Sequence, residues 1–138
     1  MDLDISDALL ERCKFLDSGN DALDLMTSNV VMRDCWIEGS IDKGVSVGED
    51  TRAFALNCAI KDCEIGMQIK DRSQAVVYNC EVSGNRQGID AYKKNWRYDS
   101  GGFGYVYKSV IKGNGSMLTA DKHSRILVHD SPVSPRAE

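Results

Sequence analysis

The chain has 138 residues, of which 42% are hydrophobic and 28% are charged, and its formal net charge at pH 7 is −4. This length predicts one folded domain, and the acidic balance argues against bulk binding to nucleic acid or to an anionic membrane surface. No apolar run approaches the roughly 18 residues of a membrane span, and the first residues lack the basic and apolar regions of a signal peptide.

A repeated unit organises the chain. Residues 22–37, 44–60 and 66–82 share one alternation of apolar and polar positions, and residues 1–20 already form an equivalent unit. Such units stack on one another, because none of them can bury its apolar face alone. Equivalent small residues recur at spacings of 22, 23, 22, 29 and 22 positions, at Cys13, Cys35, Cys58, Cys80, Ser109 and Ser131.

Each unit contains short runs with period-2 alternation, which indicates strands with one buried face. Leu10 and Phe15 bracket the marker Cys13, for example, and the pair Val45 and Val47 belongs to a different strand. The runs are too short for a helix in every unit, which excludes helical solenoids, and the LxxLxLxxN signature of leucine-rich repeats is missing. The sequence therefore predicts an all-β fold, a right-handed parallel β-helix of about six turns with three short strands per turn, over residues 1–138.

Three segments resemble a known family. Gly-Val-Ser-Val at 44–47, Gly-Met-Gln-Ile at 66–69 and Gly-Ile-Asp-Ala at 88–91 each precede a segment of the Val/Ala-x-x-x-Asn-Cys type. They resemble the degenerate repeats of the pectin-lyase-like superfamily, over residues 3–133, and the segment 42–49 is also similar to a subgroup of bacterial β-helix proteins. The resemblance implies the fold but no single activity. It also implies an extracellular or periplasmic location if the chain is part of a longer protein, while the sequence itself leaves the localisation open.

The cysteines at the marker positions are expected to form a buried, reduced stack. A disulfide between neighbouring turns is the alternative, because the spacing of paired strands lies within the Cα separation that a disulfide allows. The stack is favoured since serine continues the series and needs no bonding partner. Cys63 lies outside this series and is unpaired, which does not fit a disulfide framework.

The one irregular turn, between Cys80 and Ser109, is seven residues longer than the shortest turns, and the extra residues fall within 93–103. Loops on a rigid scaffold are where binding residues concentrate. This loop has a local charge of +2 and two interleaved aromatic residues, so we predict that it contacts substrate through Lys93, Lys94, Trp96, Arg97 and Tyr98.

A polar face next to this loop is the candidate for catalysis. The alternation predicts that Lys70 points outward beside Tyr92 of the next turn and diagonal to Asp90, with Glu49 and Asp71 at the rim. In a lyase or epimerase, Lys70 or Tyr92 would be the base, and the three carboxylates would hold a cation such as calcium that neutralises a sugar carboxylate. A hydrolase would need two carboxylates about 5 to 9.5 Å apart, and only Asp90 lies in the right part of the face. Charges of this kind are also typical of the solvated surface of a β-helix.

We interpret the chain as a carbohydrate-binding or structural module that is not catalytic by itself, with a lyase or epimerase acting on an acidic polysaccharide as the alternative. The clustered Asp-Asp and Asp-Pro-His-Glu motifs of the superfamily's hydrolases and epimerases are missing. The expected partners are a polysaccharide, a protein surface, or a second copy bound through the uncapped ends of the coil. Residues 132–138, which carry both prolines, are predicted to be a tail at which the coil stops.

Overall fold

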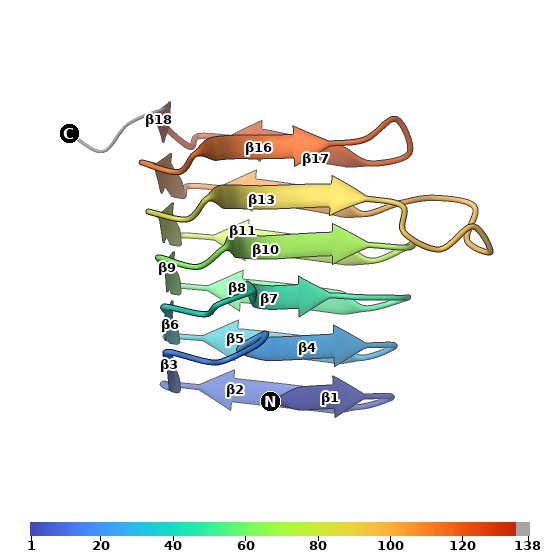
Figure 1. Cartoon of the computed structure of the whole chain (residues 1–138), viewed down its shortest axis with the longest axis horizontal. Coiled ribbons are helices and arrows are strands. Elements are labelled where there is room, and N and C mark those ends of the chain that lie inside the picture. Colours follow the sequence, from blue (N-terminus) through green and yellow to red (C-terminus); the bar gives the residue numbers. More distant parts are fainter. Residues whose placement is uncertain (135–138) are drawn as a thin grey trace.

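The computed structural model describes residues 1–134, which form a parallel β-helix of six turns (Figure 1). Each turn contributes one strand to each of three six-stranded parallel sheets, and no helix occurs in the described part of the chain. The predicted number of turns and of strands per turn is therefore confirmed. None of the described segments is a helix that could span a membrane.

The three sheets are built from every third strand along the chain. Sheet A contains β1 (Asp2–Asp4), β4 (Leu23–Met26), β7 (Lys43–Val47), β10 (Ile65–Lys70), β13 (Gln87–Tyr92) and β16 (Ser116–Ala120). Sheet B contains β2 (Asp7–Glu11), β5 (Asn29–Arg33), β8 (Arg52–Leu56), β11 (Gln74–Tyr78), β14 (Phe103–Tyr107) and β17 (Arg125–His129). Sheet C contains β3 (Lys14–Leu16), β6 (Trp36–Glu38), β9 (Ala59–Lys61), β12 (Glu81–Ser83), β15 (Val110–Lys112) and β18 (Val133–Ser134).

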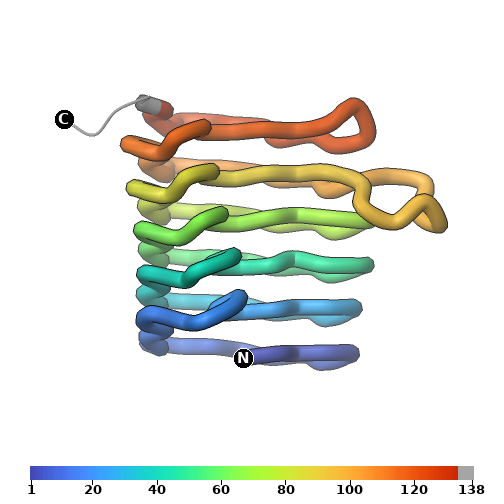
Figure 2. Tube along the Cα trace, viewed as in Figure 1, coloured from blue at the N-terminus to red at the C-terminus, as the bar shows by residue number. Residues whose placement is uncertain are grey.

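The turns of the coil lie nearly level above one another (Figure 2). Equivalent residues of successive turns pair in register and form vertical columns along each sheet. The inward side chains of the middle turns are fully buried, and they include Met67 and Ile69 of β10 at 0% exposure. They stack on Ile89 and Ala91 of β13, which are also buried. The apolar alternation of the sequence thus corresponds to the interior of the coil.

Most of the variation in the length of a turn occurs at the corner between sheets A and B. On the sheet A side of this corner, Lys70 pairs with Tyr92, 22 positions later. On the sheet B side, Gln74 pairs with Phe103, 29 positions later. The turn with 23 residues gains its extra residue at the same corner, since Asn29 pairs with Arg52. The corner between sheets C and A differs by one residue, since Trp36 pairs with Ala59 but Lys43 pairs with Ile65, 22 positions later. The corner between sheets B and C keeps a constant length, and the inserted residues do not disturb the register of the strands that flank them.

The predicted file of cysteine and serine side chains lies at the corner between sheets B and C. The N–H of Cys58 donates to Sγ of Cys80 at 3.4 Å. The N–H groups of Cys80 and Ser109 donate in turn to Oγ of Ser109 and Ser131, each at 3.0 Å. The residue before each member has a positive φ between 47° and 56°, at Arg12, Asp34, Asn57, Asn79, Lys108 and Asp130. This left-handed residue turns the chain and directs the next side chain inward, where it satisfies the amide of the preceding turn.

Cys63 belongs to a different file, at the corner between sheets C and A, and is not an isolated residue. Its N–H donates to Oδ1 of Asn85 at 2.9 Å, and the N–H of Asn85 donates to Oδ1 of Asn114 at 2.9 Å. All five cysteines are free thiols. Burial raises the pKa of the thiols of Cys35 and Cys63, which keeps them protonated and unreactive at neutral pH.

The predicted tail begins later than the sequence indicated, because β18 (Val133–Ser134) pairs with β15. Pro132 has no N–H to donate, but its carbonyl accepts a hydrogen bond from the N–H of Ile111 at 3.0 Å. A proline can therefore introduce a strand at the last turn of the coil. The rest of the predicted tail, residues 135–138, lies outside the described part of the chain.

Candidate functional site

The inserted loop, residues 93–102 between β13 and β14, folds toward the N-terminal turns, and Figure 1 shows it descending to the level of β10. Its anchor is Asp71, whose side chain is almost completely buried. Oδ1 of Asp71 accepts hydrogen bonds from the N–H groups of Lys94 at 2.7 Å and Asn95 at 2.9 Å. One carboxylate therefore fixes the start of the loop on the turn below it.

A second carboxylate fixes the far end of the loop. Oε2 of Glu49 accepts a hydrogen bond from the hydroxyl of Tyr98 at 3.1 Å, and Oε1 accepts from Nδ2 of Asn95 at 3.5 Å. The guanidinium of Arg72 lies 5.3 Å from the centre of the Tyr98 ring and makes two hydrogen bonds to Asp50. The loop is thus tied to two successive turns of the coil.

Glu49 and Asp71, the residues predicted as metal ligands, use their oxygens to hold the loop. In the described residues, no three His, Cys, Asp or Glu side chains lie close enough together to hold a metal ion.

The loop and the edge of sheet A enclose a cavity of about 280 Å³. Its walls bring together residues that are far apart in sequence, namely Asp24, Met26, Gly48, Glu49, Lys70, Asp71, Lys94, Asn95 and Trp96. Of the residues predicted to contact substrate, Lys94 and Trp96 line this cavity. Tyr98 does not line it, but its hydroxyl bonds Glu49, which does.

Lys70 lies in this cavity, whereas the sequence predicted that its side chain stands on an open, solvated face. Its exposure is 9%, and its Cε lies beside Gly48. Burial lowers the pKa of Lys70, and the neighbouring positive charges of Lys43 and Lys94 lower it further. Tyr92 stacks on Lys70 in register, and burial raises the pKa of its hydroxyl.

Asp90 lies in the neighbouring column of sheet A and is held by two side chains of the same column. Its Oδ2 accepts from Nε2 of Gln68 at 2.9 Å, and its Oδ1 accepts from the hydroxyl of Thr119 at 2.6 Å. Asp90 therefore has a fixed place beside the Lys70 and Tyr92 pair, but both of its oxygens are already engaged.

Trp96 is the most exposed large apolar side chain of the described residues, at 82%. It stands at the mouth of the cavity, and the guanidinium of Arg97 lies 5.8 Å from the centre of its ring. Lys93, Lys94 and Arg97 form no ion pair with any residue of the 1–134 range. The loop therefore presents an aromatic surface together with three positive charges, against the one negative charge of Asp99.

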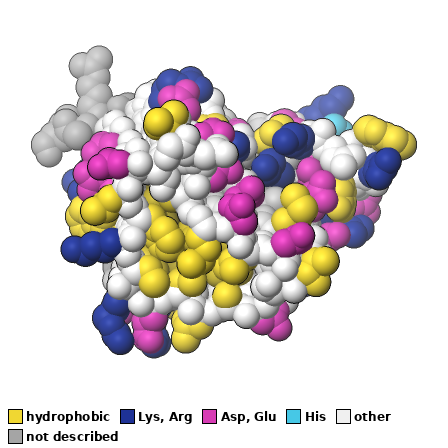
Figure 3. All heavy atoms as spheres, turned by 60° about the horizontal axis from the view of Figure 1, so that its bottom comes forward, with side chains coloured by type: hydrophobic (Ala, Val, Ile, Leu, Met, Phe, Trp, Pro, Cys, Tyr) yellow, Lys and Arg dark blue, Asp and Glu magenta, His cyan; other side chains and the backbone are white. Residues whose placement is uncertain are grey.

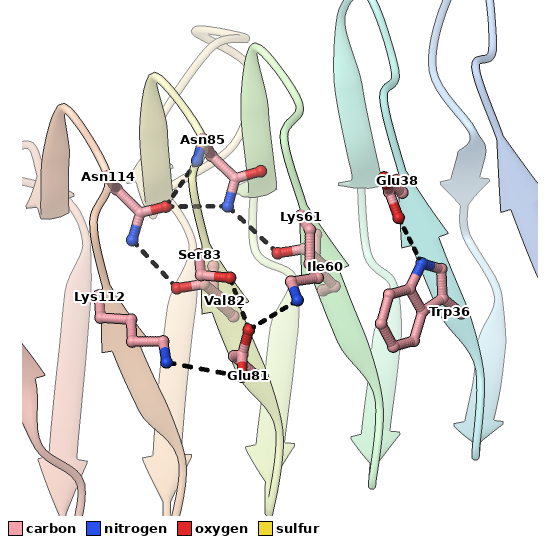
Figure 4. A network of polar contacts seen from close by, with 10 residues as sticks. All are labelled: Trp36, Glu38, Ile60, Lys61, Glu81, Val82, Ser83, Asn85, Lys112 and Asn114. Carbon is pink, nitrogen blue, oxygen red and sulfur yellow. Dashed lines mark hydrogen bonds and ion pairs between the residues drawn. The ribbon is translucent and has the colours of Figure 1, made fainter. Parts of the chain in front are cut away.

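A second hollow, which the sequence analysis did not predict, runs along the corner between sheets B and C. This groove has a volume of about 640 Å³, and Trp36 is among its lining residues. Nε1 of Trp36 donates to Glu38 at 2.7 Å, and Nζ of Lys61 lies 5.0 Å from the centre of its ring (Figure 4). Lys61 also pairs with Glu81. The tryptophan and the charges beside it thus satisfy one another, and the groove is a weaker candidate for binding than the loop cavity.

The sequence matches the family model described as "Right handed beta helix region" over residues 3–131. It has no match among curated proteins. Among solved structures, it is similar to the A-module of a mannuronan C-5 epimerase from Azotobacter vinelandii, with a TM-score of 0.65 and 19% sequence identity. The similarity covers 91% of this chain but 37% of the epimerase module, so the chain spans well under half of that protein's length. The six-turn coil and the family match lead to one conclusion: the chain belongs to the right-handed β-helix family.

Proposed function

We propose that this chain is a β-helix module that binds an acidic polysaccharide and is not catalytic by itself. The observation that carries the proposal is Trp96, a tryptophan almost fully exposed at the mouth of a cavity whose loop wall is fixed to the scaffold. An exposed aromatic ring costs solubility and is typical of a surface that binds a partner. A flat ring beside polar groups suits the apolar face of a sugar.

The charges around the ring favour an anionic chain. Lys93, Lys94 and Arg97 form no ion pair within residues 1–134 and outnumber Asp99, which gives the loop a local charge of +2. Lys70 lies close enough to Lys43 and Lys94 for their charges to lower its pKa. A uronate carboxylate bound in the cavity would relieve this repulsion, because an opposite charge stabilises the protonated amines.

Replacing Trp96 by alanine is expected to weaken binding to an acidic polysaccharide by about tenfold or more, because the stacking surface is lost. Alginate and pectate are suitable probes, and affinity gel electrophoresis or calorimetry measures the change. The matched control is Trp36→Ala, which removes a tryptophan from sheet C and is expected to leave binding unchanged. Equal losses in both variants, or tighter binding to a neutral glucan than to alginate, would contradict the proposal.

A second candidate function is a lyase or epimerase acting on an acidic polysaccharide, and the buried pair of Lys70 and Tyr92 favours it. In these reactions a base removes the proton on the carbon next to the sugar carboxylate, and a general acid must supply a proton afterwards. The lowered pKa of Lys70 increases its neutral, basic fraction, and the raised pKa of Tyr92 keeps its hydroxyl protonated. The similarity to an epimerase module supports the shared fold but not the activity.

Turnover separates the two candidates. A lyase would produce unsaturated sugars with a new ultraviolet absorbance, and an epimerase would change the uronate signals in the proton NMR spectrum of the polymer. If the chain is an enzyme, Lys70→Ala is expected to reduce turnover at least a hundredfold, in line with the usual contribution of a positioned base. Binding without turnover in the unmodified chain would leave the binding module as the function.

A further inference from the structure

Both ends of the coil expose residues that are buried in every middle turn. In the first turn Ala8, Leu10 and Phe15 are partly exposed, whereas the residues stacked on them, Val30, Met32 and Ile37, are at most 1% exposed. Figure 3 turns the N-terminal end forward and shows hydrophobic side chains gathered in its middle, with charged side chains around them.

The C-terminal end also exposes apolar residues whose equivalents are buried in the middle turns. Val128 and Val133 are 39% and 41% exposed, while Val106 and Ile111, on which they stack, are 0% exposed. Within residues 1–134, the strands β16, β17 and β18 each pair on one side only, as do β1, β2 and β3 at the other end. Each end therefore offers three strand edges around an apolar centre, and such edges are templates for further pairing.

We propose that the C-terminal end of one chain docks on the N-terminal end of a second copy, so that the columns of the coil continue across the junction. The two ends complement each other because they are consecutive positions of one repeat. One column of sheet B contains one residue from each turn, and successive members pair with each other. Its members are Asp7, Asn29, Arg52, Gln74, Phe103 and Arg125. The next position in this column is Asp7 of the second copy.

This register brings opposite charges together. Arg125 and Asp7 are both exposed and form no ion pair within residues 1–134, and at the junction they would be direct neighbours on adjacent strands. Directly opposite charges on paired strands stabilise the pairing. The same register places Val128 over Leu10 and Val133 over Phe15, which buries the apolar centres of both ends.

The hydrogen bonds of the cysteine and serine file can also continue across the junction. Along the cysteine and serine file, each amide donates to the side chain one turn above it, as the N–H of Ser109 does to Oγ of Ser131. Ser131 ends this file in the described chain, and the next position is Cys13 of the second copy. Because the contact joins two different surfaces, it does not close on itself and is expected to produce filaments whose length grows with concentration.

Charge reversal tests the contact. The unmodified chain is expected to sediment as a series of species whose sizes increase with concentration. Either Arg125→Asp or Asp7→Arg alone is expected to leave mainly the monomer, because each variant places two like charges opposite each other at the junction. Mixing the two variants restores an opposite pair at every junction, so the series is expected to return. Circular dichroism confirms that each variant keeps its fold. A chain that stays monomeric at high concentration, or forms a closed dimer, would overturn the proposal.

Engineered cysteines test the register itself. Paired strands lie about 4.8 Å apart, which is within disulfide reach, so a chain carrying both Arg125→Cys and Asp7→Cys is expected to oxidise to a ladder of covalent multimers. The matched control carries His129→Cys with Asp7→Cys, which are four positions, or about 13 Å, out of register. Equal ladders from both chains would mean that the ends associate without the proposed alignment.

Discussion

Replacing Asp71 by alanine is expected to lower the free energy of unfolding by about 3 kcal/mol and to remove binding to the polysaccharide. The carboxylate of Asp71 is buried and accepts hydrogen bonds from two main-chain amides of the loop. Hydrogen bonds to a charged group contribute about 1.5 to 3 kcal/mol each to the free energy of unfolding. In the variant, the two main-chain N–H groups of the loop would have no hydrogen-bond acceptor. Urea denaturation measures the first effect, and affinity gel electrophoresis measures the second.

Asp71→Asn is the matched control, because asparagine keeps an oxygen that can accept the same bonds and tolerates the positive φ of 43° at this position. It is expected to cost about half as much stability and to retain part of the binding. Protease digestion provides an independent readout, since the loop released by Asp71→Ala is expected to be cut first. If Asp71→Ala bound alginate as tightly as the unmodified chain, the loop would have no part in the site.

Asn85→Ala is expected to have a comparable effect on stability, about 3 kcal/mol, without acting through the loop. The Asn85 side chain is 2% exposed, accepts from the N–H of Cys63, and donates to the carbonyl of Ile60 at 3.2 Å and to Oδ1 of Asn114 at 2.9 Å. Removing it leaves buried polar groups of two neighbouring turns unpaired, and each costs about 1 to 3 kcal/mol.

The control for this prediction is Asn29→Ala, which removes an exposed asparagine whose amide bonds the carboxylate of Asp7. It is expected to change the free energy of unfolding by less than about 0.5 kcal/mol, as surface substitutions usually do. Thermal or urea denaturation compares the two variants. A similar, small change in both would show that the file at this corner contributes little to the coil.

The fold could be predicted from the sequence because one small residue recurs at a nearly constant spacing, and the structure stacks those residues in one file. The second file escaped prediction because Cys63, Asn85 and Asn114 share a position but not a side-chain type. The signal was present in the residue before each member, an Asp or Gly that adopts a positive φ.

The site was predicted less well than the fold. The pairing of Lys70 with Tyr92 follows from the register and is as predicted. The burial of Lys70 was not predictable, because it depends on the direction in which the loop folds. That direction is set by contacts between Glu49 and loop residues 46 and 49 positions away, which no local pattern encodes.

The corner between sheets A and B has one more implication. Since this corner accepts seven extra residues without a change in strand register, a segment grafted there in another turn would leave the ladders of all three sheets intact. The edge of the coil would then carry a row of interchangeable arms, each one turn above the last. Such a row could follow a polymer along its length, with the spacing of the arms fixed by the pitch of the coil.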